Sequence, residues 1–295
     1  MQAKNIFLDI LYTIRPKHWV KNFFVFAPLF FSGNAGIVDV FIASLTIFFA
    51  FCLISSSVYI LNDISDHDRD RAHPTKKNRP IAAGRLSVPA AAFIAVALAA
   101  AALFIAMRLN IWAAGVLLAY GVINIAYSTY LKHVVIVDVF CISLGFVLRV
   151  VGGGLAIAVT PSSWLITATF LLSLFLALAK RRHELVLLEG KSENHRPVLN
   201  DYSARLVDEL ISVVTPLTLI SYLLYTLEPA TIARFNAPNI YFTGGLVTFG
   251  IFRYLYLIHK QNLGGSPTDL VFQDVPLLVA IVSWVLSFGA IIYLR

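Results

Sequence analysis

Four aspartates and an asparagine fall within nine residues that read NDISDHDRD, directly after a long apolar run. On a helix that continues through this stretch, Asn62, Asp66 and Asp70 share one face, and so do Asp63, Asp66 and Asp70. Carboxylates at this spacing repel one another, and a divalent cation removes the penalty. Hard oxygen ligands suit Mg²⁺, which usually bridges to substrate phosphates. The spacing therefore predicts a Mg²⁺ and phosphate site with these four residues as ligands.

The aspartates run directly into a basic stretch, RAHPTKKNRPIAAG. Acid on a helix face followed by a basic loop suits an anion held by a metal on one side and by guanidinium groups on the other. Arg79, beside Pro80, is the candidate for that contact. For Lys76 and Lys77 the alternative is a loop that is basic because it faces the cytoplasm. For the aspartates the alternative is a solvated acidic cap, and Asp68 lies off the shared face.

The composition indicates which elements must position these side chains. The chain has 295 residues, of which 59% are hydrophobic and 13% are charged, and its mean hydropathy is +0.79. Soluble domains average about 25% charged residues, so we expect an all-α membrane protein with many spans. The apolar runs are too long for barrel strands. Nine spans are expected, at about residues 20–34, 38–61, 88–107, 110–130, 134–158, 163–180, 206–227, 240–259 and 275–294.

Lys and Arg residues are unevenly distributed over the loops of this nine-span topology. The side that carries the N-terminus has 18 of the 23, and the other side has three. Positive loops face the cytoplasm, so we expect a bacterial inner (cytoplasmic) membrane with the N-terminus inside. The same bias accounts for the net charge of +7, so no nucleic-acid partner is invoked. Membrane lipids with anionic headgroups suit some of this charge.

The whole chain, residues 1–295, is interpreted as one transmembrane domain. Residues 1–18 are too charged for a cleavable signal peptide and predict a short amphipathic helix on the cytoplasmic surface. Two polar islands, at about residues 62–87 and 181–205, both fall on the cytoplasmic side of the expected topology. We therefore expect a helical bundle with a polar cavity that faces the cytoplasm.

Two charges lie deep in the fifth expected span. Asp138 and Arg149 are eleven residues apart, close to three helical turns, so both point the same way. Charges at membrane depth are rare and usually face a bundle interior or a wet cavity. A rise of about 16 Å separates the two residues, which argues against a mutual ion pair. We expect both to line the cavity.

Several other residues have simpler interpretations. Cys52 and Cys141 lie in apolar runs and suit packing better than a disulfide or a metal. Gly152–Gly154 predict close helix packing rather than a phosphate loop. Arg253 in the eighth expected span has two open interpretations, facing the cavity or snorkelling.

NDISDHDRDRAHPTKKNRPIAAG resembles the first aspartate motif of the UbiA superfamily of intramembrane prenyltransferases. IRPKHWVKNFFVFAPLFF is similar to the first helix of one branch, the decaprenyl-phosphate phosphoribosyltransferases. YSTYLKHVVIVDVFCISLGFVLRVVGG and LALAKRRHEL extend the resemblance over nearly the whole chain. The tail GGSPTDLVFQD is similar to that branch's G-G-x-P-E-E ending, with Thr268 and Asp269 where two glutamates are usual. A UbiA-like bundle is the fold that the resemblance implies.

The resemblance implies further substrate-binding residues. Superfamily members contact substrate phosphate at the cytoplasmic end of spans four and five, where this chain has Tyr127 and Lys132. The match to RPKHWVKN adds Lys21 and Asn22. The alternatives are an interfacial aromatic anchor for Tyr127 and a snorkelling side chain for Lys21.

After the sixth span the chain departs from the wider superfamily. Aromatic prenyltransferases of this fold have a second aspartate motif there, whereas this chain reads KRRHELVLLEGKSENHRPVLNDYS. Lys180, Arg181 and Arg182 replace the carboxylates, and Glu184 is the only acid in the first turns. A basic cluster binds phosphate oxygens without a metal. This favours a donor with a diphosphate at one end and a phosphate at the other, as in phosphoribosyl pyrophosphate.

Together with the resemblance, these features predict a Mg²⁺-dependent transferase. It would move the 5-phosphoribosyl group of phosphoribosyl pyrophosphate to a decaprenyl-type polyprenyl phosphate, an early step toward an arabinan precursor for the cell wall. Asp66 and Asp70 are the expected catalytic residues. Arg149, Lys180 and Arg181 are the expected phosphate contacts, with Glu184 beside them, and their division between the two phosphates stays open. The alternatives are a UbiA-type prenyltransferase with an aromatic acceptor and, outside enzymes, a transporter; a homo-oligomer is one option for the assembly.

Overall fold

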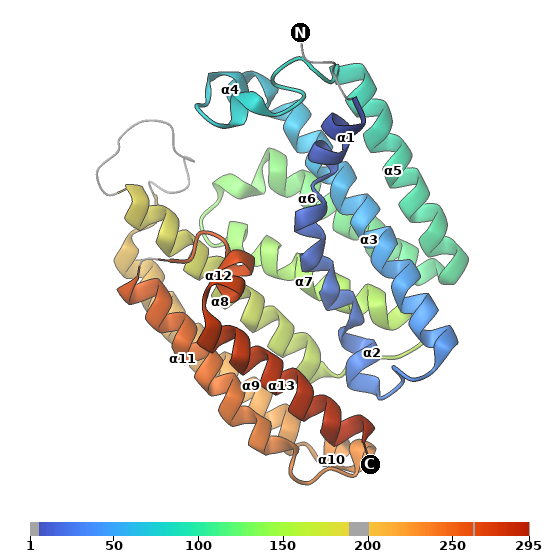
Figure 1. Cartoon of the computed structure of the whole chain (residues 1–295), viewed down its shortest axis with the longest axis vertical. Helices are drawn as coiled ribbons and strands as arrows, with labels where there is room; N and C mark the ends of the chain where they lie inside the picture. The colour runs from blue at the N-terminus through green and yellow to red at the C-terminus, as the bar shows by residue number, and fades with distance from the viewer. Residues whose placement is uncertain (1–5, 189–200, 262, 295) are drawn as a thin grey trace. The chain divides into compact units, whose positions relative to one another are not determined.

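The computed structural model describes residues 6–188, 201–261 and 263–294. Every regular element within these ranges is helical (Figure 1). The elements are α1 (Ile6–Ile14), the 3-10 helix η1 (Pro16–Phe26), α2 (Ala27–Ser32), α3 (Val38–Ser65), α4 (His67–Ala72), η2 (Lys76–Asn78), α5 (Val88–Leu109), α6 (Ile111–Thr129), η3 (Leu131–His133), α7 (Val137–Ala156), α8 (Ser163–Leu188), α9 (Ala204–Leu227), α10 (Pro229–Phe235), η5 (Ile240–Thr243), α11 (Gly244–Lys260), α12 (Pro267–Gln273) and α13 (Val275–Tyr293).

Eight helical segments in the described ranges are long and apolar enough to cross a membrane. They coincide with the second to the ninth expected spans, which confirms an all-α polytopic membrane protein. Two of them run further than the apolar pattern indicates. α3 continues to Ser65 and α8 continues to Leu188, because polar residues extend these helices beyond the apolar segment without breaking them.

The first expected span, residues 20–34, is not one continuous helix. Its residues belong to the end of η1 and to α2, which is six residues long and ends at Gly33 with a φ of 79°. Pro28 lies in the first turn of α2, where its missing N–H and fixed φ favour a new helix start over continuation of the preceding one. The expectation of nine spanning helices is therefore not confirmed, and eight candidate spans lie in the described part of the chain.

The chain divides into two compact units. Unit 1 comprises residues 1–130 and 148–160, and unit 2 comprises residues 131–147 and 161–295. The first part of α7 belongs to unit 2 and the rest belongs to unit 1. The interpretation of residues 1–295 as one domain stays a prediction.

In unit 1, α3 packs against α5, α6 and η1. The buried residues of α5 are all alanines, namely Ala91, Ala95, Ala102 and Ala106. Small residues spaced by four or seven positions lie on one face and let two membrane helices approach closely. The hydroxyl of Ser57 in α3 donates a hydrogen bond to the backbone oxygen of Ala95 at 2.7 Å, which fixes this close approach.

A second close approach explains the glycine run of α7. A Cβ atom at Gly153 would lie 2.1 Å from the backbone oxygen of Val25 in η1. No other residue fits there without moving the backbone. The interpretation of these glycines as close packing is confirmed at Gly153.

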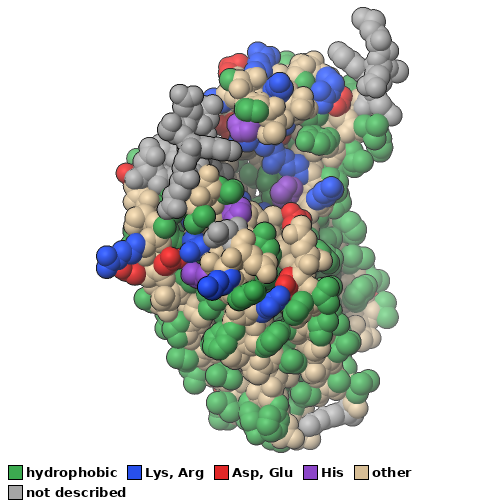
Figure 2. Space-filling model, turned by 60° about the vertical axis from the view of Figure 1, so that its left-hand side comes forward, with side chains coloured by type: hydrophobic (Ala, Val, Ile, Leu, Met, Phe, Trp, Pro, Cys, Tyr) green, Lys and Arg blue, Asp and Glu red, His purple; other side chains and the backbone are tan. Residues whose placement is uncertain are grey.

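In unit 2, α11 packs against α8, α9 and α13. The buried stripes of these helices meet in one core that includes Phe175, Leu178, Ile211, Leu257 and Ile258. The remaining faces expose many large apolar side chains, and hydrophobic side chains are frequent over the lower part of the face shown in Figure 2. Apolar patches of this extent suit contact with lipid.

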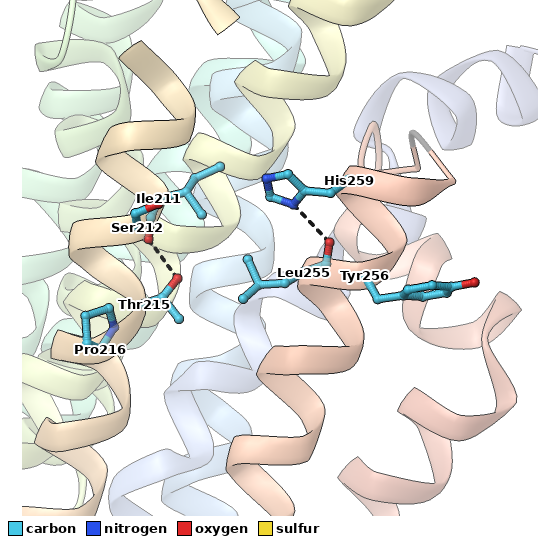
Figure 3. Close-up of a pocket in the computed structure, with 7 residues that line it drawn as sticks. All are labelled: Ile211, Ser212, Thr215, Pro216, Leu255, Tyr256 and His259. Carbon is cyan, nitrogen blue, oxygen red and sulfur yellow. Dashed lines mark hydrogen bonds between the residues drawn. The ribbon is translucent and has the colours of Figure 1, made fainter. Parts of the chain in front are cut away.

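Unit 2 also has an open cavity of about 510 Å³ between α9 and α11 (Figure 3). Pro216 lies inside α9 at this point and removes one N–H from the helical hydrogen bonds. The cavity is lined by Ile211, Ser212, Thr215, Pro216, Leu255, Tyr256 and His259. No residue expected in the functional site lines it, so this cavity is separate from the chemistry that the sequence predicts.

Candidate functional site

The aspartate segment lies in unit 1 where α3 ends and α4 begins. Asp66 is the junction residue, with φ −95° and ψ 1°. The helical hydrogen bonds continue across it, because the N–H of Asp66 donates to the carbonyl of Asn62 at 2.9 Å and the N–H of Asp70 donates to that of Asp66 at 2.8 Å. The spacing that predicts a shared face is therefore preserved across the junction.

Arg79 joins two of these aspartates. Its Nη1 donates to Oδ1 of Asp63 at 3.0 Å and to Oδ2 of Asp70 at 2.7 Å. Both aspartates are 3% exposed. A buried carboxylate without a partner is strongly unfavourable, so the guanidinium supplies the charge that allows both to be buried. Arg79 thus lies beside the aspartates, where the sequence predicts an anion contact, and pairs with them.

Arg15 is a site residue that the sequence analysis did not assign. Its Nη2 also donates to Oδ1 of Asp63, and its guanidinium lies 5.1 Å from the centroid of the Tyr59 ring. Its φ of 53° is uncommon for a residue other than glycine and costs free energy that the surrounding contacts must offset. The available signal is an Arg-Pro dipeptide, which occurs at both Arg15 and Arg79. The dipeptide alone does not indicate that the two guanidinium groups meet on one carboxylate.

The other residues of the segment lie on different faces of the helix, as their spacing predicts. Nδ2 of Asn62 donates to Oδ2 of Asp66 at 3.2 Å. The side chain of Asp68 is 78% exposed and lies near His67 and Arg71. Figure 2 shows charged side chains of both signs over the end of unit 1 that carries α4, at the top of the view.

The donor chemistry of this segment fits a hard divalent cation, since it offers carboxylate and amide oxygens. Within the described residues, however, no three His, Cys, Asp or Glu side chains are grouped so as to hold a metal ion. Arginines instead pair with these carboxylates, at Oδ1 of Asp63 and at Oδ2 of Asp70. Oδ1 of Asp63 accepts from both Arg15 and Arg79, and metal binding by Asp63 stays a prediction.

Arg149 is held inside unit 1 by polar side chains from other segments. Its Nε donates to Oδ1 of Asn22 at 2.7 Å, and its Nη2 donates to the hydroxyl of Tyr120 at 2.8 Å. Its guanidinium also lies 4.7 Å from the centroid of the Tyr120 ring. The amide of Asn22 is itself buried and donates to Sγ of Cys52 at 3.2 Å. Asn22 therefore orients Arg149, and Tyr120 is a second residue that the sequence analysis missed.

Lys21 brings a further positive charge to this part of unit 1. The residue is half-buried, and its ammonium lies within Coulombic range of Arg149 and Arg15. Like charges in a partly buried environment repel one another more strongly than in water. An anion bound among these three cations relieves that repulsion, so their grouping suits a phosphate.

Unit 2 contains a buried ion pair between Asp138 and Arg181. Nε of Arg181 donates to Oδ2 of Asp138 at 2.7 Å, and the two residues are 2% and 0% exposed. Nη1 of Arg181 also donates to Oε2 of Glu184. The ammonium of Lys180 lies 3.9 Å from Oε1 of Glu184, and the Lys180 side chain is 42% exposed. The cluster therefore has one buried cation fixed by two carboxylates and one accessible cation beside it.

Tyr202 completes this cluster and was not assigned from the sequence. Its hydroxyl donates to Oδ1 of Asp138 at 2.8 Å and accepts from the backbone N–H of Ile136 at 2.7 Å. Burial and the hydrogen bond to Asp138 raise the pKa of Tyr202, so the hydroxyl stays a donor at neutral pH. Ile136 has a φ of 69°, an outlier for a β-branched residue, and Tyr202 holds it there. A lone tyrosine after a polar segment carries no pattern that reveals this role.

Arg182 points away from that cluster. Its Nε donates to Oδ1 of Asp208 at 2.6 Å, and its Nη1 donates to the carbonyl of Ile258 at 2.8 Å. Arg182 thereby joins α8 to α9 and α11. A step of about 100° around the helix separates neighbouring residues, which is why Arg181 and Arg182 have different partners.

Three other expectations have mixed outcomes. Tyr127 at the end of α6 and Lys132 in η3 are half-buried and both interact with other groups, and phosphate binding by either stays a prediction. Arg253 forms a two-point ion pair with Asp274, with Nη2 at 2.8 Å from Oδ2 and Nε at 3.1 Å from Oδ1. The second polar island includes residues 189–200, which lie outside the described residues.

These helices and buried charges define an integral membrane protein with many spans, and ionisable groups inside such a protein mark a functional site. Residues 22–273 match the model of the UbiA prenyltransferase family, so the chain belongs to that family and is a transferase by membership.

Similar proteins extend over nearly the full chain. A protein from Mycolicibacterium smegmatis named decaprenyl-phosphate phosphoribosyltransferase is 31% identical over 98% of this chain and 94% of its own length. A protein of the same name from Corynebacterium glutamicum is 31% identical over 99% of this chain and 89% of its own length. The structure of a UbiA homolog from Archaeoglobus fulgidus bound to GPP and Mg²⁺ superposes with a TM-score of 0.71 at 18% identity, covering 96% of this chain and 99% of that one. The fold is therefore that of the UbiA family.

Proposed function

We propose that this chain transfers the 5-phosphoribosyl group of phosphoribosyl pyrophosphate to a polyprenyl phosphate and releases pyrophosphate. One observation carries the proposal: α8 presents Lys180 and a buried Arg181 where an aromatic prenyltransferase would have a second carboxylate cluster. The accessible ammonium of Lys180 suits a substrate phosphate directly. The names of the relatives at 31% identity support the same reaction.

We assign the pyrophosphate of the donor to the aspartate segment of unit 1. Asn62, Asp66 and Asp70 would hold the divalent metal, and Mg²⁺ is the ion that their oxygen atoms and a diphosphate favour. When bound, Mg²⁺ supplies positive charge that stabilises pyrophosphate as it leaves. The Archaeoglobus fulgidus UbiA homolog, solved with GPP and Mg²⁺, supports metal use in this fold.

The reaction needs little covalent help from the protein. A phosphate oxygen of the acceptor attacks C1 of the ribose, the bond from C1 to the pyrophosphate oxygen breaks, and pyrophosphate leaves with the electron pair. The acceptor phosphate is already an anion at neutral pH, so no strong general base is required. The residues of the chain act by positioning and by electrostatic stabilisation.

The cations of the two units are assigned to the other phosphates. Lys180 offers an accessible ammonium, and Arg181 is held rigid by Asp138, Glu184 and, through Asp138, Tyr202. In unit 1, Arg149 is fixed by Asn22 and Tyr120. We assign the acceptor phosphate and the ribose 5-phosphate to Lys180 and Arg181 of unit 2 and to Arg149 of unit 1, without assigning either phosphate to a particular cation.

The location of the reaction follows from the distribution of charge. Basic residues are concentrated in the loops that follow α3 and α8, and positive loops face the cytoplasm. We therefore place the site at the cytoplasmic face of a bacterial inner membrane, with the N-terminus inside. The polyprenyl chain would lie among apolar helices, and the product would supply an arabinan precursor for the cell wall.

The identity of the product tests this proposal. Purified protein in detergent is incubated with phosphoribosyl pyrophosphate and polyprenyl phosphate, and the lipid fraction is analysed by mass spectrometry. We expect a lipid that has gained one phosphoribosyl group, with pyrophosphate released in equal amount. Release of pyrophosphate without the new lipid would show hydrolysis of the donor and would contradict the assigned acceptor.

A further inference from the structure

The counter-charges of Asp63 and Asp70 are unequal. Asp63 accepts from two guanidinium groups, those of Arg15 and Arg79, through one carboxylate oxygen. Among the described residues, Asp70 has one cationic partner, Arg79, at 2.7 Å. If Arg79 leaves, Asp63 keeps a counter-ion, whereas Asp70 becomes a buried carboxylate without one.

The backbone of Arg79 is fixed while its side chain is long. The backbone N–H donates to the carbonyl of Lys76 at 2.9 Å, and the carbonyl accepts from the N–H of Ala83 at 2.8 Å. Pro80 follows and restricts Arg79 to the extended conformation that it adopts, with φ −61° and ψ 141°. Exchange of its partners therefore requires movement of the side chain alone.

Asp70 belongs to the set of oxygen donors that suits a divalent cation, yet a guanidinium already occupies it. A divalent cation on Oδ2 of Asp70 would lie beside the guanidinium that already donates to that atom, and the two positive charges would repel each other. We infer that Arg79 is the resident cation of the metal-free protein and competes with the divalent metal for Asp70. In the same inference Asp63 is an anchor for Arg15 and Arg79 rather than a metal ligand. The inference rests on the proposed function of this segment.

Each charged side chain of this cluster keeps a counter-charge through the exchange. Two carboxylates and two guanidinium groups balance in the metal-free state. A metal that arrives with a diphosphate brings positive charge for Asp70 and negative charge for the released Arg79. Guanidinium groups bind phosphate oxygens in two-point contacts, so Arg79 exchanges one anionic partner for another. Arg79 thus couples metal binding to the presence of a diphosphate.

The competition is tested without turnover, on the full-length protein in lipid nanodiscs. Mn²⁺ binding is measured by electron paramagnetic resonance in the absence of substrates. Arg79→Gln should lower the dissociation constant for Mn²⁺ at least tenfold, because Asp70 loses its competing cation. Arg79→Lys keeps the charge on a shorter side chain and should lower the dissociation constant for Mn²⁺ at least threefold. This variant still tests the competition if Arg79→Gln folds poorly.

Two matched variants separate competition at Asp70 from a general change in charge. Arg15→Gln removes a guanidinium that pairs with Asp63 and not with Asp70. It should change the dissociation constant for Mn²⁺ less than threefold. Arg71→Gln removes the same charge next to Asp70 in the chain, but Arg71 pairs with Asp68 and with the carbonyl of Ala82. Its dissociation constant should stay within twofold of the wild type.

Thermal unfolding supplies a second measurement. In EDTA, Arg79→Gln should melt below the wild type, because Asp70 is buried without a counter-ion. Saturating Mg²⁺ should raise its melting temperature by more than it raises that of the wild type. An equal rise in both proteins would contradict the inference.

The outcomes distinguish the inference from the proposed function. If Asp70→Asn abolishes Mn²⁺ binding but Arg79→Gln binds no more tightly than Arg71→Gln, the metal site stands and the competition is wrong. If neither the wild type nor Arg79→Gln binds Mn²⁺, with or without pyrophosphate, the metal site itself is wrong and the inference is wrong with it.

Discussion

Burial separates the aspartates of unit 1 into two kinds at the scale of single residues. Asp70 is buried and paired with Arg79, whereas the side chain of Asp68, two positions earlier, faces solvent. Position on the helix face therefore decides which carboxylates can take part in chemistry. This difference makes the two residues a matched pair for mutation.

Asp66→Ala and Asp70→Asn should each lower turnover at least a hundredfold, because each removes an oxygen donor from the proposed metal site. Loss of a group that stabilises the leaving charge typically costs about 2.7–4 kcal/mol, which corresponds to such a factor. Asp68→Ala should retain at least half of the activity, and EDTA should abolish turnover by the wild type. The measurement is transfer of labelled ribose phosphate to lipid. Equal losses at Asp68 and Asp70 would show that the helix face is wrong.

Arg149→Ala should lower kcat/KM at least tenfold. A buried charge-assisted contact that loses one partner costs about 2–5 kcal/mol, and 1.36 kcal/mol is a factor of ten. Tyr120→Phe is the control, because it removes one hydrogen bond from Arg149 but keeps the ring beside the guanidinium. We expect a smaller loss in Tyr120→Phe, measured by steady-state kinetics. A loss as large as that of Arg149→Ala would indicate that Arg149 has a structural role only.

At the scale of helices, α8 directs two neighbouring arginines to different tasks. Arg181 joins the cluster of Asp138, Glu184 and Tyr202, while Arg182 joins α8 to α9 and α11. The first is a phosphate contact in the proposed function, and the second holds three helices together. Their substitutions should therefore affect different measurements.

Arg182→Ala should lower the free energy of unfolding by about 1–3 kcal/mol, because it leaves Asp208 and the carbonyl of Ile258 without this donor. The folded protein should retain near-normal turnover. Arg181→Lys keeps the charge but cannot make the two-point contact with Asp138 and Glu184, and turnover should fall at least tenfold. Chemical unfolding and the lipid-labelling assay are measured on both variants. A turnover loss in Arg182→Ala equal to that in Arg181→Lys would contradict this division.

The start of α13 depends on an acid. Asp274 caps the helix by accepting from the N–H of Leu277 at 2.9 Å and pairs with Arg253. The hydrogen bonds from Arg253 hold the pKa of Asp274 below its ordinary value. A lowered pKa in the folded state contributes stability that is present above the ordinary value, near 4, and is lost as the pH falls through the folded-state value. The ion pair therefore stabilises unit 2 at neutral pH.

Asp274→Asn should lower the melting temperature at pH 7. On acidification below pH ~4, the melting temperature of the variant should fall by less than that of the wild type. The measurement is thermal unfolding of wild type and variant in detergent across that range. Because both proteins share all other carboxylates, their difference reports Asp274. A difference that is constant between neutral and acidic pH would contradict the assigned role of its charge.

The spanning helices could be predicted because each is a run of apolar residues longer than any soluble strand or loop. The segment before α3 could not be predicted, because apolar composition does not reveal that a 3-10 helix begins at Pro16 and that a new short helix begins at Ala27, with Pro28 in its first turn. The shared face of the aspartates follows from helical spacing alone. The pairing of these aspartates with arginines does not follow from spacing, because the chain must turn back after α4 to bring Arg79 to Asp63. Arg15 and Tyr202 depend on tertiary contacts that no local pattern encodes.

For the molecule as a whole, the two units carry different kinds of polar cluster. Unit 1 combines carboxylates with Arg15, Arg79 and Arg149, and unit 2 combines Arg181 and Lys180 with Asp138 and Glu184. A prenyltransferase that binds one diphosphate through metal ions needs carboxylates in both units. A donor with a diphosphate and a separate phosphate, together with an anionic acceptor, needs a metal site for the diphosphate and direct cationic contacts for the other phosphates. The contrast between the units is therefore the main physical reason to favour a phosphoribosyl donor.

A comparison of the two donors in separate reactions tests that claim most directly. The purified protein is given Mg²⁺ and either labelled phosphoribosyl pyrophosphate with polyprenyl phosphate or labelled prenyl diphosphate with an aromatic acid, and transfer of label is measured in both. We expect a labelled lipid in the first reaction, no labelled lipid with Asp70→Asn or in EDTA, and no product in the second reaction. Transfer from prenyl diphosphate to the aromatic acid, with no reaction of phosphoribosyl pyrophosphate, would contradict that claim.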